Sequence, residues 1–362
     1  MSQPAHSPRG RGAKSNASGR FEALSAEAFD DGWTEDDAAS PPLRTTLTAE
    51  RAKTIIARND SPDVGFDRSI NPYRGCEHGC IYCYARPAHA YVGLSPGLDF
   101  ESRLFFKPDA ARLLAKELAA PAYRAKPIHI GGNTDPYQPA ERKLGVTRQL
   151  LEVLEAAGHP FSIITKSALI ARDADILGRM GRRGLAKVAI SITSLDRKLA
   201  RAMEPRASTP ERRLSTLAAV VAAGAPTAVM FAPAIPALND HEMEAVLERA
   251  AAAGASGAGY VMLRLPREIK DLFRAWIEDA APDRARRVMS LVRQMRGGRD
   301  YDPNWRSRMK GEGPVAEIFA RRFALAKRRF GLDRPSPALD LGQFRPPRPA
   351  SSQLELFEAQ AS

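Results

Sequence analysis

All three cysteines of this 362-residue chain, Cys76, Cys80 and Cys83, lie within the eight residues CEHGCIYC. Thiolates are soft metal ligands, so this clustering predicts metal chemistry on one loop. The set has no distant cysteine with which to pair, so it does not resemble a disulfide framework. Unpaired thiols also indicate a reducing compartment, and we expect the protein to be cytoplasmic.

Three kinds of metal site are candidates for the spacing C-x3-C-x2-C. A structural zinc ion usually has four protein ligands, so His78 or His89 would have to supply the fourth. A c-type haem needs a histidine directly after the last cysteine, where this chain has Tyr84. A [4Fe–4S] cluster on three thiolates leaves one iron without a protein ligand, where a substrate or cofactor can bind. The spacing favours the cluster, and a non-enzymatic zinc- or cluster-binding module is the alternative.

Alternating strand and helix patterns follow the cysteine loop and must position it. Helical periods separate short apolar runs, which predicts right-handed βαβ units and a parallel sheet. Six such units predict an α/β fold, a partial (β/α)6 barrel in which ligand-binding residues gather at the carboxyl ends of the strands. The predicted strands are residues 68–74, 127–132, 161–166, 187–193, 225–233 and 257–265.

The chain changes character on both sides of the expected barrel, which we assign to residues 49–265. Residues 1–48 are polar and rich in Pro, Ser and Gly, which predicts a disordered N-terminal tail. Residues 266–333 show only helical patterns, so we expect a C-terminal helical extension. Residues 334–362 are expected to form a second, Pro-rich tail. The chain has no apolar run of about 18 residues, so we expect no membrane span.

The charge of the chain bears on its partners. The formal net charge is +12, from 54 Lys and Arg against 42 Asp and Glu. A basic surface attracts polyanions through phosphate contacts and the release of counterions. Several arginine pairs fall on predicted helices, where a solvated face is the usual outcome. Charge therefore favours a nucleic-acid partner without naming one.

The segment NPYRGCEHGCIYCYARP resembles the cluster loop of the radical S-adenosylmethionine (SAM) superfamily, including Tyr82 before the third cysteine. The surrounding sequence is similar to the spore photoproduct lyase-like group, whose members are often named DNA repair photolyases. The resemblance implies a [4Fe–4S] loop at residues 71–87, in which Cys76, Cys80 and Cys83 each bind one iron. The fourth iron would bind SAM, whose reductive cleavage gives a 5′-deoxyadenosyl radical that abstracts hydrogen from the substrate.

The resemblance also implies a cofactor site at the ends of three strands. Gly131 and Gly132 match the glycine pair that binds the methionine amino group of SAM. Lys166 ends the third strand, where it would pair with the cofactor carboxylate and take part in catalysis. Ser191 and Thr193 end the fourth strand and would meet the ribose hydroxyls.

Two features depart from the family pattern. Asn133 follows the glycine pair where many relatives have glutamate. Spore photoproduct lyase relies on an additional cysteine as hydrogen donor, and this chain has none, so we expect Tyr137 to be the catalytic hydrogen donor or the reaction to differ. Lyase activity on that photoproduct is therefore not expected. With three cysteines used, a second cluster held by cysteines is not expected either.

Several substrate classes remain open. The leading hypothesis is a radical SAM enzyme that acts on nucleic acid in a repair-like reaction, because charge and family resemblance both favour it. The second is radical SAM modification of a protein or a small molecule. A reductant such as flavodoxin or ferredoxin is the expected redox partner in either case.

The C-terminal segment QLELF, residues 353–357, resembles the short peptide by which bacterial DNA polymerases and repair proteins bind the sliding clamp. The resemblance implies that Gln353 hydrogen-bonds at the rim of the clamp pocket. Leu354, Leu356 and Phe357 would fill an apolar groove. A Pro-rich spacer would hold the peptide away from the barrel. The alternative is that this apolar tail packs on its own domain.

Overall fold

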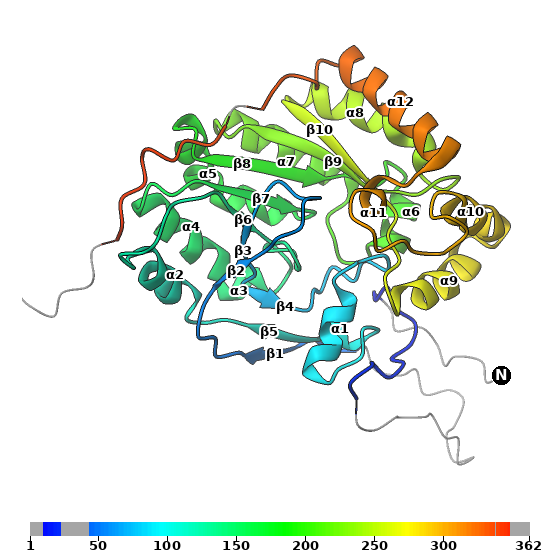
Figure 1. Cartoon of the computed structure of the whole chain (residues 1–362), viewed down its shortest axis with the longest axis horizontal. Coiled ribbons are helices and arrows are strands. Elements are labelled where there is room, and N and C mark those ends of the chain that lie inside the picture. Colours follow the sequence, from blue (N-terminus) through cyan, green and yellow to red (C-terminus); the bar gives the residue numbers. More distant parts are fainter. Residues whose placement is uncertain (1–9, 23–42, 337, 348–362) are drawn as a thin grey trace, which may run out of the picture.

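The computed structural model describes residues 10–22, 43–336 and 338–347 (Figure 1). Within these ranges, a seven-stranded sheet has the strand order β10-β9-β8-β7-β6-β3-β2. Six of its strands are parallel. They are β3 (Arg68–Ile70), β6 (Ile128–Ile130), β7 (Phe161–Thr165), β8 (Ala186–Ser191), β9 (Thr227–Ala234) and β10 (Gly257–Met262). Each overlaps one of the six predicted strands, so the partial (β/α)6 barrel is confirmed.

Helices connect the parallel strands as the βαβ pattern requires. The long connecting helices are α2 (Ala110–Leu118), α4 (Val146–Ala156), α5 (Ala174–Arg182), α7 (Pro210–Ala222) and α8 (Met243–Ala252). Shorter helices, α3 (Glu141–Leu144) and α6 (Arg197–Met203), precede α4 and α7. The Thr209 hydroxyl accepts a hydrogen bond from the Arg212 N–H, and Pro210 occupies the first helical position, which together begin α7.

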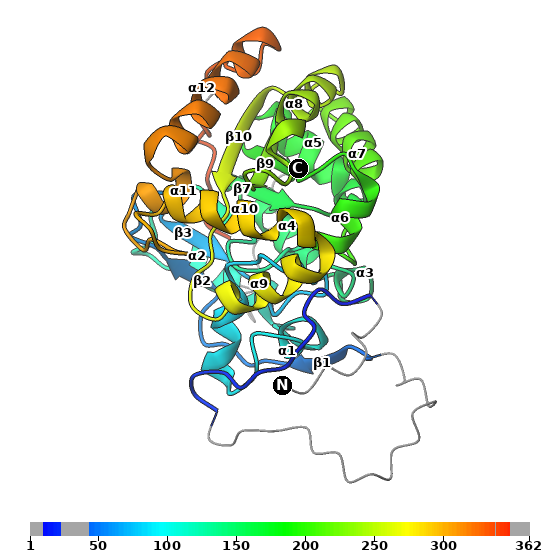
Figure 2. The ribbon, with the colours of Figure 1, turned by 90° about the vertical axis from the view of Figure 1, so that its right-hand side faces the viewer.

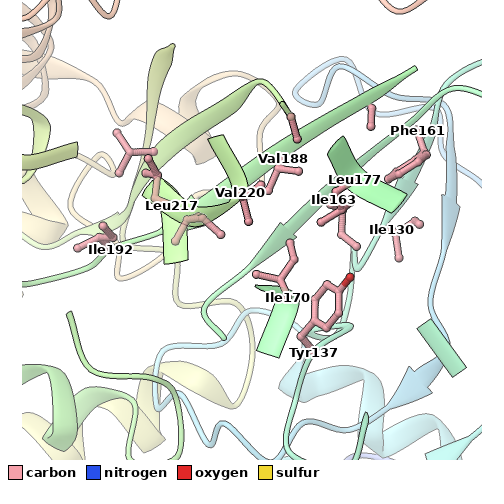
Figure 3. Close-up of a cluster of buried hydrophobic side chains, with 14 of the residues drawn as sticks. Ile130, Tyr137, Phe161, Ile163, Ile170, Leu177, Val188, Ile192, Leu217 and Val220 are labelled. Atoms are coloured by element: carbon pink, nitrogen blue, oxygen red, sulfur yellow. The ribbon is translucent and has the colours of Figure 1, made fainter. Parts of the chain in front are cut away.

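The main hydrophobic core lies between the sheet and these helices (Figure 3). Ile163 of β7 and Val188 of β8 are buried there, together with Leu177 of α5 and Leu217 of α7. Burial alternates along β7 and β9, so every second residue faces the helices. The residues between them, such as Met230 of β9, are only partly buried and face the inner side of the open barrel.

A second sheet supports the start of the cysteine loop. It has the order β1-β5-β4, with β1 (Thr46–Ala49) parallel and β4 (Tyr73–Arg74) antiparallel to the central β5 (Arg103–Phe106). A 3-10 helix, η1 (Arg86–Val92), and a short helix, α1 (Asp99–Ser102), lie between β4 and β5 in the chain. The edge strand β2 (Ile56–Arg58) pairs antiparallel to β3 and is not among the predicted strands.

Residues 10–22 pack against the folded chain, although the sequence predicts a disordered tail over residues 1–48. The Arg11 guanidinium donates to the carbonyl of Glu101 at 2.6 Å, and the N–H groups of Gly12 and Ala13 donate to its carboxylate at 2.9 and 2.8 Å. Ala13 is fully buried beside Cys80. Composition predicts whether a segment can form its own core, and it cannot reveal that a buried carboxylate elsewhere binds the segment's backbone.

The helical extension is confirmed. It contains α9 (Ile269–Ala280), α10 (Pro282–Gln294), α11 (Ser307–Lys310) and α12 (Gly313–Arg329). Figure 2 shows α9 and α10 lying across the end of the barrel, while α12 runs along its side next to α8. No helix of the described ranges is long and apolar enough to cross a membrane.

Residues 338–347 follow the barrel surface, so this part of the expected Pro-rich spacer does not stand clear of it. The Asp340 N–H donates to the Gly184 carbonyl at 3.0 Å, and the Arg345 N–H donates to the Ala157 carbonyl at 2.9 Å. The Phe344 ring lies 5.2 Å from the His159 ring, in an edge-to-face contact. These contacts lie at the amino ends of β7 and β8, opposite the end of the barrel at which ligands are expected.

Candidate functional site

The cysteine loop begins directly after β4 and is closed by backbone hydrogen bonds. The Cys76 N–H donates to the Phe100 carbonyl at 2.9 Å, and the Cys83 N–H donates to the Cys80 carbonyl at 3.2 Å. All three thiols are free, with Cys76 and Cys80 buried and Cys83 partly buried. Burial raises the pKa of all three thiols, and for Cys76 the charges of Cys80 and Cys83 raise it further. The sulfur atoms are therefore gathered in one desolvated region.

Each histidine that could complete a zinc site has one ring nitrogen near another polar group, although Nδ1 of both has no hydrogen-bond partner among the described residues. Nδ1 of His78 lies 3.2 Å from a carboxylate oxygen of Asp135, and Nε2 of His89 lies 3.0 Å from the Arg103 carbonyl. Among the described residues, no three His, Cys, Asp or Glu side chains converge as ligands of a single ion. The ligands of one ion must meet at a point, whereas the thiolates of a cluster bind separate irons. The described residues therefore offer no ready set of four ligands for one zinc ion on this loop.

A buried arginine holds the middle of the loop in place. Arg86 is fully buried, and its guanidinium donates to the carbonyls of Cys80 at 2.9 Å and Gly79 at 3.0 Å. The same guanidinium forms an ion pair with Glu101, which is also fully buried. Glu101 is the residue that binds the backbone of Gly12 and Ala13. The sequence analysis does not identify Arg86 or Glu101, because an arginine and a glutamate fifteen residues apart carry no local signal.

The glycine pair lies at the carboxyl end of β6, as expected. Gly131 has a φ of +90°, and a Cβ there would lie 2.6 Å from Pro136 Cδ, so no other residue fits the turn without strain. A Cβ on Gly132 would make only ordinary contacts, so packing within the protein does not require this second glycine. The Gly132 carbonyl accepts a hydrogen bond from the Tyr84 hydroxyl. Asn133 is exposed, and its N–H donates to the Asn71 side chain at 2.8 Å.

Asp135 joins three parts of the site. Besides its contact with His78 of the cysteine loop, its carboxylate accepts from the Thr165 hydroxyl at 2.6 Å and from the Lys166 N–H at 2.8 Å. Burial raises the pKa of Asp135, but the electrostatic interaction with His78 and these hydrogen bonds outweigh burial and lower it to about 2. The ammonium group of Lys166 lies 5.8 Å from the centre of the Tyr82 ring. Lys166 therefore sits at the end of β7, next to the cysteine loop.

A second buried network surrounds Tyr82. Its hydroxyl donates to the Glu204 carboxylate, which also accepts from the Thr193 hydroxyl at 2.5 Å and pairs with the Arg213 guanidinium. Arg213 also donates to the Ser191 carbonyl at 3.0 Å. Burial raises the pKa of Glu204, but the charges of Arg213 and Lys166 outweigh it, so the net pKa is lowered. The Thr193 hydroxyl thus already has a protein partner, and its expected ribose contact stays a prediction, as does that of Ser191.

Tyr137 belongs to the main hydrophobic core. Its ring is fully buried in the main core near Ile163 and Ile170 (Figure 3), and its hydroxyl donates to Asp173 at 3.1 Å. A hydrogen donor to a substrate radical has to reach the substrate, and the burial of Tyr137 does not favour this, so its catalytic role stays a prediction. Tyr84, directly after Cys83, is 47% exposed and lies beside the glycine pair. The sequence analysis used Tyr84 only to exclude haem.

Comparison with known proteins agrees with this arrangement. The model of the radical SAM superfamily matches residues 70–250, which is half of the chain. An uncharacterized protein of Mycobacterium bovis is 35% identical over 274 residues, covering 75% of this chain and 78% of the relative. An uncharacterized protein of Methanocaldococcus jannaschii is 27% identical over 173 residues, covering 48% and 62%. The solved structure of a spore photoproduct lyase mutant has a TM-score of 0.55 at 17% identity, covering 78% of this chain and 79% of that one.

The fold and the site define an open α/β barrel with three free thiols on one loop. The chain belongs to the radical SAM superfamily, as the family match shows. It is therefore an enzyme whose cofactors are a [4Fe–4S] cluster and SAM. The likeness to spore photoproduct lyase extends to the fold.

Proposed function

We propose that Cys76, Cys80 and Cys83 hold the [4Fe–4S] cluster and that the enzyme cleaves SAM reductively at this site. When bound, the cluster supplies the electron that splits SAM into methionine and a 5′-deoxyadenosyl radical. The observation that carries the proposal is the contact between His78 and Asp135, because it joins the cysteine loop to the glycine turn and to Lys166. The desolvated surroundings strengthen every charge interaction there.

The residues around the loop would bind and orient SAM. The Gly132 carbonyl is an acceptor for the amino group of SAM once the Tyr84 hydroxyl leaves it. The Lys166 ammonium would pair with the cofactor carboxylate in a charge-assisted hydrogen bond. Glu204 fixes the Tyr82 hydroxyl, which holds the aromatic ring directly beside the third cysteine. Tyr84 replaces Tyr137 as the tyrosine best placed to meet the substrate.

Nucleic acid is the substrate class that the surface favours. Arg197, Lys198 and Arg201 of α6 are exposed, and none forms an ion pair with a carboxylate of the described residues. They line a cavity of about 520 Å³. The cavity adjoins the cysteine loop, because the Ile81 N–H donates to the Met203 carbonyl at the end of α6 at 3.0 Å. Unpaired cations beside a reaction centre suit a phosphate backbone, and the resemblance to DNA repair photolyases points the same way.

We also propose that the C-terminal peptide binds the bacterial sliding clamp. Gln353, Leu354, Leu356 and Phe357 lie outside the described residues. The described residues that precede them bond to the loops before β7 and β8, at the end of the barrel opposite the cysteine loop. A clamp bound by the peptide would therefore leave the cofactor end accessible. The enzyme would work in the cytoplasm, because three unpaired thiols suit a reducing compartment. A flavodoxin or ferredoxin would be its reductant.

Anaerobic reconstitution tests the proposal. The purified full-length protein would be loaded with iron and sulfide, reduced, and given SAM, and 5′-deoxyadenosine would be measured. We expect a cluster absorbance band and 5′-deoxyadenosine, and tight zinc binding without a cluster would contradict the proposal. Adding single-stranded DNA, duplex DNA, RNA or protein extract would then identify the class of substrate. We expect one of the nucleic acids to increase 5′-deoxyadenosine formation, and stimulation by protein extract alone would favour protein modification.

A further inference from the structure

The loop between α10 and α11, residues 295–306, presents a tryptophan to solvent. Trp305 is 55% exposed. The segment around it is tightly held: the Asn304 N–H donates to Asp302 at 2.9 Å, and the Ser307 hydroxyl donates to the same carboxylate. The Arg306 N–H and the Arg308 guanidinium both bond to Asp63, which belongs to the loop before β3. The chain on both sides of the exposed indole is therefore held in place.

The backbone beside Trp305 is strained. Arg306 has a φ of +70°, a conformation that costs a residue with a side chain free energy. The Asp63 side chain, which accepts from the Arg306 N–H and the Arg308 guanidinium, is 1% exposed. The strained backbone and the exposed tryptophan lie next to each other. Strained residues cluster at functional sites, and an exposed large apolar side chain can mark a binding surface.

Unpaired positive charge lies on both sides of the ring in the sequence. Arg299 and Arg306 are exposed and form no ion pair within the described ranges. Other arginines of the same region are paired: Arg293 bonds to Asp300 at 2.8 Å, and Arg308 pairs with Asp63. The loop thus combines one exposed aromatic face with two guanidinium groups that form no ion pair within the described ranges.

The loop is connected to the cofactor end of the barrel. The Arg296 guanidinium donates to the Leu263 carbonyl at 2.9 Å, directly after β10. Arg264 lies 3.3 Å from the Met309 sulfur through Nη1, and its guanidinium lies 5.1 Å from the centre of the Tyr84 ring. Tyr84 in turn bonds to the glycine pair. Figure 1 shows α11 next to the carboxyl end of β10.

We propose that Trp305 stacks on an unpaired base of a nucleic-acid strand, while Arg299 and Arg306 contact its phosphates. This inference rests on the proposed nucleic-acid substrate. It adds the place where the strand lies on the protein and the single-stranded form in which it binds. A flat ring with free guanidinium groups beside it suits single-stranded nucleic acid, because every base offers a stacking face and every nucleotide a phosphate. A protein partner would suit the tryptophan equally, but it gives no reason for leaving both arginines without carboxylates on a chain of net charge +12.

Binding of a fluorescein-labelled single-stranded oligonucleotide to the full-length reconstituted protein tests the inference. Trp305→Ala should weaken binding about tenfold, whereas Trp305→Phe, which keeps a stacking ring, should stay within about threefold of the unchanged protein. Leu325→Ala is the matched control, because Leu325 is 59% exposed on α12 and should not contact the strand. The fluorescence of Trp305 should also be quenched by the oligonucleotide, and the remaining signal in Trp305→Phe should not be.

The outcomes separate this inference from the proposed function. Cluster content and SAM cleavage without substrate should be unchanged in Trp305→Ala, since Trp305 is not part of the cofactor site, and these measurements also show that the variant is folded. If the oligonucleotide binds Trp305→Ala as tightly as the unchanged protein, the stacking inference is wrong and the nucleic-acid proposal stands. If the unchanged protein binds no DNA or RNA at low salt, both are wrong.

Discussion

A Cβ atom on Gly12 would lie 1.9 Å from the carbonyl oxygen of Gly79. The backbone of the N-terminal segment therefore lies directly on the cysteine loop, between two of the cysteines. Glu101 supplies the hydrogen bonds that hold it there, and Arg86 binds Glu101 and the Gly79 carbonyl together. The segment thus covers the loop from outside.

Gly12→Ala should displace residues 10–22, because the methyl group and the Gly79 carbonyl cannot occupy the same space. We expect faster tryptic cleavage at Arg11 and Lys14 and a several-fold faster loss of the cluster absorbance in air. Ser18→Ala is the control, since Ser18 lies in the same segment and is exposed. Equal cleavage and decay rates for the two variants would contradict the covering role.

Alanine in place of Cys76, Cys80 or Cys83 should remove the intact cluster and SAM cleavage together. Each thiolate would bind one iron, and the chain has no fourth cysteine to replace a lost one. Iron and sulfide content and 5′-deoxyadenosine formation are the measurements. Full SAM cleavage by any one of the three variants would overturn the ligand assignment.

Lys166→Ala should weaken SAM binding about tenfold or more while iron content stays normal, because the lost interaction is a charge-assisted hydrogen bond. SAM affinity can be followed through its effect on the electron paramagnetic resonance spectrum of the reduced cluster. Lys143→Ala, at an exposed position on α3, should leave the affinity unchanged. An unchanged affinity in Lys166→Ala would show that Lys166 does not bind the cofactor.

Stability should fall as the pH is lowered below 6.5, partly through His159. Burial lowers its pKa from 6.5 to about 4, so the unfolded chain binds a proton that the folded protein excludes. The contribution of neutral His159 is fully present above pH 6.5 and is lost as the pH falls through 4, by roughly 2 kcal/mol between pH 7 and pH 5. Urea unfolding at pH 7 and at pH 5 should show that the free energy of unfolding falls less for His159→Gln than for the unchanged protein. His241→Gln, at a side chain that is 64% exposed, should behave like the unchanged protein.

A labelled peptide of residues 345–362 should bind the cognate sliding clamp with saturation. Leu356→Ala and Phe357→Ala should each remove most of this binding, because the two side chains would supply the apolar contacts. Gln353→Ala should weaken it less, since one rim hydrogen bond contributes less free energy than a filled groove. If the peptide does not bind at high clamp concentration, the clamp proposal is wrong. The nucleic-acid proposal then rests on charge and family resemblance alone.

Local patterns were sufficient for the cluster loop and the order of the barrel. The spacing C-x3-C-x2-C places three thiols on one loop whatever the rest of the chain does. Alternating strand and helix periods predict β6 to β10 and their helices, because burial of one face repeats along each element. The glycine pair follows β6 directly, so its place at the carboxyl end of a strand is also a local consequence.

The partners that hold the site were decided by the tertiary structure. His78 meets Asp135, and Tyr82 meets Glu204, across long separations in the chain. No period or spacing encodes such pairs, since each carboxylate alone resembles any surface acid. Tyr137 shows the reverse case: it follows the glycine turn closely, yet the turn directs its ring into the core.

The same division applies to the ends of the chain. Composition identified residues 1–48 as unable to form a core of their own, which says nothing about a surface that another part of the protein offers them. Only the fold places the buried carboxylate of Glu101 where it binds the N–H groups of Gly12 and Ala13. Sequence determined which residues do the chemistry, and the packing of distant segments decided what surrounds them, because desolvation and long-range hydrogen bonds depend on neighbours that local sequence does not specify.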